Sequence, residues 1–161
     1  MKTAFYPCCE TDIVTPVTLM QSYVDRIVFC DIRELLHEWK RRQPKDIVES
    51  APISEFVVGD AQKVMLKIPV IDVLYYRRDS SGEGGSGLYV LGDMFLRPLM
   101  ARFSFSGGYI FTDGSNSRGG NFKRMVRRSG MEKFGRHFSA TTEQPYLDTY
   151  GLWRIRVSAP L

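Results

Sequence analysis

Two carboxylates stand directly after apolar runs in the first half of the chain. Asp31 follows the run 26–30, and Asp60 follows the run 53–58 and Gly59. Such a run predicts a buried strand, so each carboxylate should lie where a strand ends. There it can accept hydrogen bonds from the hydroxyl groups of a ligand, or it can cap the following helix. Both interpretations stay open for each acid.

Three cysteines could meet near the first two predicted strands. Cys8 and Cys9 follow the first strand, and Cys30 ends the second. A metal site needs about four ligands, and His37 and His137 are far away in sequence without paired spacing. We therefore interpret the cysteines as buried, unreactive thiols and predict no metal site. Three cysteines are also too few for a disulfide framework, which indicates a reducing compartment.

The segment 118–136 carries the excess positive charge of the chain. It holds seven Lys and Arg against one Glu, which leaves 15 basic and 17 acidic residues elsewhere. Like charges four residues apart on a helix repel one another, so a bound anion would offset them. The segment is either a solvated helix face or a site for nucleic acid, although no recognised nucleic-acid motif accompanies it. The candidate contacts to nucleic acid are Lys123, Arg124, Arg127 and Arg128.

No residue pattern identifies a catalytic group. The segment 78–87, RDSSGEGGSG, has the composition of a flexible loop but lacks the Lys-Ser/Thr ending of a P-loop and the GxGxxG pattern. Ser115 is not set in a GxSxG motif, and the two histidines are too widely separated to argue for a Ser-His-Asp triad. The catalytic residues are therefore unknown from sequence.

The elements that would position these residues alternate between strands and helices. Helices are predicted at 11–22, 33–42 and 88–99, with Pro16 and Pro98 expected to delay, kink or split two of them. Strands are predicted at 3–6, 26–30, 53–58, 71–76, 109–112, 133–139 and 152–158. The last two strands have no convincing helix between them, so they should pair antiparallel. This order predicts an α/β fold with a mostly parallel sheet and helices on both faces.

Composition supports one ordinary domain spanning residues 1–161. The chain has 161 residues, 43% of them hydrophobic, which is enough for a real core. The net charge of +4 permits an anionic partner without requiring one. No run approaches the ~20 apolar residues of a membrane span, and no signal-peptide pattern opens the chain. We expect a cytoplasmic protein that does not act at a membrane, and its oligomeric state is unknown.

The order of elements and the acids at the strand ends resemble class I S-adenosylmethionine-dependent methyltransferases. The resemblance covers nearly the whole chain and implies a Rossmann-like sheet that ends in an antiparallel strand pair. It implies that Asp31 binds the ribose hydroxyls of the cofactor and that Asp60 lies near its adenine. Gly107-Gly108 before Tyr109 is similar to the glycine turn that precedes the fifth strand of the family.

The chain departs from the family in the loop after the first strand. The family has a glycine-rich loop there, where the backbone must approach the ligand without a Cβ in the way. This chain has Tyr6-Pro7-Cys8-Cys9-Glu10-Thr11-Asp12, with no glycine. An Asn-Pro-Pro-Tyr type motif after the fourth strand is also absent, so no methyl acceptor is assigned. By resemblance the candidate cofactor-binding residues are Tyr6, Cys9, Glu10, Asp31, Asp60 and Ala61.

Two functions follow from these observations. The first is an atypical methyltransferase-like enzyme that binds S-adenosylmethionine, or a related nucleoside, through an altered loop. The second is a methyltransferase-like module that does not catalyse and instead binds a protein or nucleic-acid partner.

Overall fold

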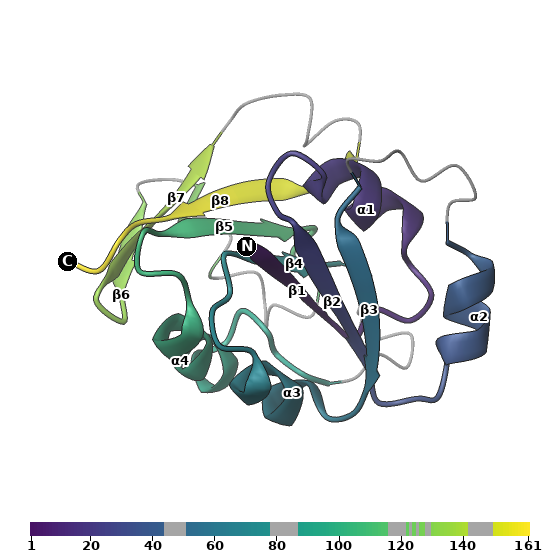
Figure 1. Ribbon diagram of the computed structural model, residues 1–161. Coiled ribbons are helices and arrows are strands. Elements are labelled where there is room, and N and C mark those ends of the chain that lie inside the picture. The colour runs from purple at the N-terminus through teal and green to yellow at the C-terminus, as the bar shows by residue number, and fades with distance from the viewer. Residues whose placement is uncertain are drawn as a thin grey trace.

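The chain forms one eight-stranded mixed sheet with helices on both faces. The computed structural model describes residues 1–43, 51–77, 87–115, 122, 124, 126–127, 130–141 and 150–161. Within that part of the chain the strand order is β3-β2-β1-β4-β5-β8-β7-β6. The strand order reverses between β1 and β4, because the chain first builds the sheet outward in one direction and then crosses over to build it in the other (Figure 1). Parallel sheets of this kind hold ligands at such a reversal.

Five parallel strands make up the first part of the sheet. They are β1 (Thr3–Pro7), β2 (Arg26–Asp31), β3 (Ile53–Val58), β4 (Val73–Tyr76) and β5 (Gly108–Thr112). The three remaining strands are β6 (Met131–Lys133), β7 (Arg136–Thr141) and β8 (Trp153–Val157), and they are antiparallel to their neighbours. The predicted mostly parallel sheet and its antiparallel end are confirmed.

The helices are α1 (Val14–Met20), α2 (Leu36–Arg41), α3 (Ala61–Lys67) and α4 (Asp93–Arg102). Helices α1 and α2 lie over one face of the sheet, and α3 and α4 cover the other (Figure 1). Successive side chains of a strand point to opposite faces of the sheet, so each strand contributes to both layers of the core. In β1, Phe5 packs with α3 and α4, whereas Ala4 and Tyr6 pack on the side of α1. None of the described helices is long and apolar enough to span a membrane.

The predicted strand 133–139 is confirmed over 136–139, which belong to β7, but its start is wrong because the chain turns back at Phe134 and Gly135. Lys133 pairs with Arg136, and the two residues between them, Phe134 and Gly135, have φ angles of 52° and 69°. Positive φ at both central residues is the geometry of a two-residue hairpin turn. Strand β6 is therefore a third antiparallel strand, added to the two that were predicted.

Of the two prolines within predicted helices, Pro16 acts as predicted, whereas Pro98 has a smaller effect than predicted. Pro16 lies in the first turn of α1, where a missing N–H costs no helix hydrogen bond, so this helix starts late as expected. Pro98 does not split α4, which runs without interruption from 93 to 102. Buried Leu96 and Leu99 flank this proline and anchor both halves of the helix to the core.

Helix α3 was not predicted, because only seven residues separate Asp60 from Ile68.

Candidate ligand site at the carboxyl ends of the strands

The parallel strands end at one edge of the sheet, which we call the carboxyl edge. A cavity of about 420 Å³ lies there beside the loop 8–13 and the start of α1. Three of the six predicted cofactor residues line it, namely Tyr6, Cys9 and Glu10. Asp31, Asp60 and Ala61 are not among its lining residues. The structure therefore brings together only half of the predicted set in one cavity.

The loop after β1 makes a glycine-like turn without glycine. Cys8 and Glu10 have φ angles of 55° and 49°, in the left-handed region that glycine adopts freely. Each such residue costs roughly 1–2 kcal/mol for a side chain with a Cβ. The turn is held by a hydrogen bond of 3.0 Å from the Cys9 N–H to the Cys30 carbonyl. The backbone turns here as glycine would allow, but the side chains of Cys8 and Glu10 occupy space that glycine would leave open.

Asp31 is held by four hydrogen bonds from its own chain. Its Oδ1 accepts from the backbone N–H and the Nε of Arg33, both at 3.0 Å. Its Oδ2 accepts from the Glu10 N–H at 2.9 Å and from Arg33 Nη2 at 3.3 Å. An ionised carboxylate has about four lone-pair positions, so the set is complete. Arg33 also reaches the Glu10 carboxylate at 3.1 Å, which ties the loop to the end of β2.

This network fixes the charge of Asp31. Burial would raise the pKa of the Asp31 carboxyl, but the hydrogen bonds from Arg33 and Glu10 outweigh burial and lower it. The pKa of Arg33 is raised by the same carboxylates. Asp31 is therefore an ionised carboxylate that already has a cationic partner.

Asp60 caps the helix that follows it. Its Oδ1 accepts from the N–H groups of Gln62 at 2.8 Å and Lys63 at 3.1 Å, which is the usual role of an N-cap aspartate. Ala61 is the first residue of α3 and is buried. For Asp60 the capping alternative is confirmed, and its proposed place near adenine stays a prediction.

A second ion pair lies deeper at the same edge and was not predicted. Arg77, the residue after β4, lies 2.8 Å from the Asp12 carboxylate, and the two side chains are only 6% and 13% exposed. The Tyr6 hydroxyl donates to Asp12 at 3.0 Å. Burial raises the pKa of Tyr6, and the Asp12 carboxylate raises it further, so the phenol stays protonated. Two features of the sequence could have indicated this pair: Arg77 follows a predicted strand, and Asp12 lies in the loop after the first strand.

The cysteines at this edge differ in exposure. Cys9 and Cys30 are buried as predicted, whereas Cys8 is half-buried. Burial raises the pKa of the Cys30 thiol to about 12, and it also raises the pKa of Cys9. These two thiols are therefore protonated and unreactive near neutral pH. Within the described ranges, no cluster of three or more His, Cys, Asp or Glu side chains is placed to hold a metal ion.

The described residues of the basic segment pack on the face of the sheet that carries α3 and α4. Phe122 and Val126 are buried, with Phe122 against Phe138 of β7, while Arg124 and Arg127 are exposed. The Arg127 guanidinium lies 4.9 Å from the centre of the Trp153 ring. Lys123 and Arg128 lie outside the described residues, as does most of the loop 78–87. Nucleic-acid binding by this segment stays a prediction.

Solved structures with this fold include methyltransferases and spermidine synthases. An rRNA methylase from Streptococcus thermophilus matches with a TM-score of 0.56 and 9% identity, over 99% of this chain and 88% of that one. A methyltransferase from Geobacter sulfurreducens matches with a TM-score of 0.59 and 13% identity, over 98% and 70%. A Streptococcus mutans protein of this class, solved in complex with SAH, matches with a TM-score of 0.59 and 12% identity, over 98% and 89%. No family model and no curated protein matches the chain by sequence.

The chain therefore has the fold of class I S-adenosylmethionine-dependent methyltransferases, as the resemblance implied. The residues at its carboxyl edge do not fit that cofactor as they stand. The oxygens of Asp31, which the resemblance assigned to the ribose, already accept hydrogen bonds from Arg33 and Glu10, and residues with side chains stand in the loop where the family has glycines.

Proposed function

We propose that this protein is a binding module with a methyltransferase fold and does not transfer methyl groups. The observation that carries the proposal is the saturated carboxylate of Asp31. Ribose hydroxyls are neutral donors, and hydrogen bonds from a charged guanidinium are roughly twice as strong as neutral ones. A nucleoside would have to displace Arg33 to reach Asp31, and it would gain weaker bonds than it breaks.

The loop supports the same conclusion. Cys8 and Glu10 place side chains where a close approach of backbone to ligand would need none. Glu10 also brings a second carboxylate, which is bridged by Arg33. Arg77, the described residue that follows β4, is held in its buried ion pair with Asp12. Asp31, Asp12, Arg33 and Arg77 therefore all pair within the chain at this edge.

Calorimetric titration with S-adenosylmethionine and S-adenosylhomocysteine tests the proposal. We expect no binding tighter than about 1 mM, which corresponds to roughly 4 kcal/mol. Micromolar affinity of the unmodified protein would contradict it. Arg33→Ala frees the Asp31 carboxylate and should increase affinity, because only then can ribose hydroxyls reach it. Arg26→Ala, which removes a half-buried ion-pairing arginine at the other end of β2, is the matched control and should bind no better than wild type.

A further inference from the structure

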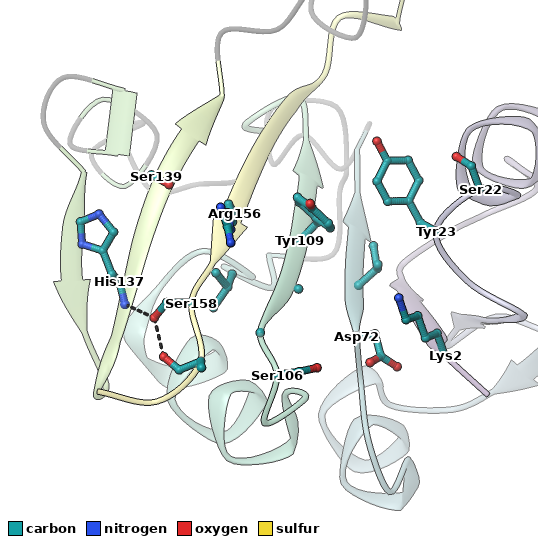
Figure 2. A pocket seen from close by; sticks show the side chains of 15 residues that line it. Lys2, Ser22, Tyr23, Asp72, Ser106, Tyr109, His137, Ser139, Arg156 and Ser158 are labelled. Atoms are coloured by element: carbon teal, nitrogen blue, oxygen red, sulfur yellow. Dashed lines mark hydrogen bonds between the residues drawn. The ribbon is translucent and has the colours of Figure 1, made fainter.

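A groove of about 660 Å³ lies at the opposite end of the sheet from the loop 8–13. It follows the edge where β1, β4 and β5 begin, which we call the amino edge, and where the antiparallel β8 ends. It opens on the face that carries α1, beside the end of that helix. Figure 2 shows Tyr109 and Arg156 on neighbouring strands in the middle of the groove, with His137 on one side and Lys2 on the other. A volume of this size is in the range of ligand sites.

The lysine and arginine side chains that line this groove form no ion pair with the described residues. Arg156 and Lys2 are exposed, and neither side chain has an ion pair or hydrogen bond within the described part of the chain. Arg156 is paired in register with Tyr109 on one side and Ser139 on the other, so all three side chains leave the same face of the sheet. This differs from the carboxyl edge, where Arg33 and Arg77 are each paired with a carboxylate.

A buried arginine strengthens the positive field under the groove. The Arg136 guanidinium donates to the carbonyls of Phe103, Ser104 and Ser158 at 2.9–3.0 Å and is buried. No carboxylate among the described residues forms an ion pair with it. An arginine remains charged even when burial lowers its pKa, as burial does here. Because Ser158 lines the groove, this uncompensated charge acts close to any anion bound there.

The one acid among the lining residues is occupied by the backbone. Asp72 accepts a hydrogen bond of 2.8 Å from the Thr3 N–H, which fixes the start of β1. Apart from Lys2, Arg156 and His137, the other polar side chains of the lining carry hydroxyl groups; they are Ser22, Tyr23, Ser106, Tyr109, Ser139 and Ser158. Hydroxyls together with Lys and Arg are the side chains that contact phosphate groups.

The placement of the cations suits a polymer. Lys2 precedes β1 and Arg156 lies on β8, three strand spacings of about 4.8 Å apart, which puts about 14 Å between their strands. Successive phosphates of one strand can contact both cations along that span. Between them lies Tyr109, whose ring is half-exposed and is packed edge-on against Tyr23. A row of separated cations with an aromatic ring between them suits successive phosphates and a stacked base.

We propose that this groove binds single-stranded nucleic acid, with phosphates on Arg156, His137 and Lys2 and a base against Tyr109. The proposal is independent of whether the carboxyl edge accepts a nucleoside, because the two sites lie at opposite edges of the sheet. It also differs from the prediction for the segment 118–136, which packs on the other face.

The test is fluorescence anisotropy with a labelled single-stranded RNA oligonucleotide. With two cationic phosphate contacts, Lys2 and Arg156, we expect the affinity to fall about sevenfold between about 50 and about 200 mM salt. The double variant Lys2→Glu/Arg156→Glu should weaken binding at least about tenfold, since two contacts become repulsive. Both residues are exposed, so circular dichroism should show an unchanged fold. The matched control Lys63→Glu/Lys67→Glu, at exposed lysines of α3 on the opposite face, should stay within about twofold of wild type.

Four results would overturn the proposal. They are no binding by the wild-type protein at low salt, equal binding by the groove variant, loss of binding only in the control variant, and equal competition by a polyglutamate peptide or a free nucleotide. A failure of this proposal can be told apart from a failure of the proposed function, because Lys2 and Arg156 line the groove at the amino edge and not the cavity at the carboxyl edge.

Discussion

The two edges of this sheet use the same residue types in opposite ways. At the carboxyl edge, Arg33 and Arg77 are each bound to a carboxylate of the same chain. At the amino edge, no carboxylate of the described residues pairs with Arg156 or Lys2, and the described partners of the buried Arg136 guanidinium are carbonyls. Among the described residues, the charges of Arg33 and Arg77 are therefore neutralised within the chain, whereas those of Arg156 and Lys2 are not.

This difference shows that a fold's usual ligand position is not decided by topology alone. Strand order brings polar loops to the carboxyl edge. Whether these loops bind anything depends on how many of their hydrogen-bonding groups are already used. Asp31 has the expected position and burial, but its own neighbours take up its acceptor capacity.

The largest expected effect is at the amino edge, at Gly108. A Cβ there would lie 1.9 Å from the Asp72 carbonyl oxygen, which is backbone and cannot move aside. We expect Gly108→Ala to lower the free energy of unfolding by about 3 kcal/mol or more. Gly135→Ala is the control: its φ is +69° but nothing lies near its Cβ, so it should cost only about 1 kcal/mol. Urea unfolding measures both, and equal losses would refute the steric account of the groove wall.

Arg136 gives the next largest effect. Arg136→Met fills similar space but leaves the three buried carbonyl acceptors without their donor, which should cost about 2–3 kcal/mol. Arg41→Met, at an exposed arginine of α2, should change stability by less than about 0.5 kcal/mol. If the two variants unfold at the same urea concentration, Arg136 does not hold the amino edge together.

The carboxyl edge should respond to acid. The folded pKa of Asp31 is lower than its unfolded value of about 3.9, so its contribution to stability is complete above that pH and is lost as pH falls through the folded value. Asp31→Asn should therefore be less stable than wild type near neutral pH, and the gap should narrow below about pH 4. Urea unfolding measured at a series of pH values checks this. Parallel curves for the two proteins would mean that the Arg33 network does not stabilise the ionised carboxylate.

The smallest effect concerns thiol chemistry at the carboxyl edge. Cys8 is half-buried and should be alkylated first in the folded protein, while buried Cys9 and Cys30 should react only after unfolding. Mass spectrometry after timed iodoacetamide treatment follows this order. Early labelling of Cys30 would show that the carboxyl edge opens readily and that its closed network is not a fixed feature.

Much of the fold could be predicted from sequence, because apolar runs and amphipathic stripes mark strands and helices directly. The hairpin at Phe134-Gly135 was missed, since Phe134 seldom adopts the positive φ that the turn requires. The short helix α3 was missed because a seven-residue helix shows too few turns for periodicity to stand out.

The site was harder to predict than the fold. The sequence correctly placed Asp31 at the end of a strand, but nothing in its spacing indicated that Arg33, two residues later, folds back onto it. The amino-edge groove joins residues from both ends of the chain, Lys2 and Arg156. Only the strand order brings them to one face, so no local pattern could have identified them.

Amide chemical-shift mapping by NMR, with the single-stranded oligonucleotide and with S-adenosylhomocysteine in turn, tests the contrast between the edges most directly. We predict oligonucleotide-dependent shifts at Lys2, Tyr109, Arg156 and Ser158, and no shifts from S-adenosylhomocysteine at Glu10, Asp31 or Gly59. Shifts at the carboxyl edge with S-adenosylhomocysteine, and none at the amino edge with the oligonucleotide, would contradict this account.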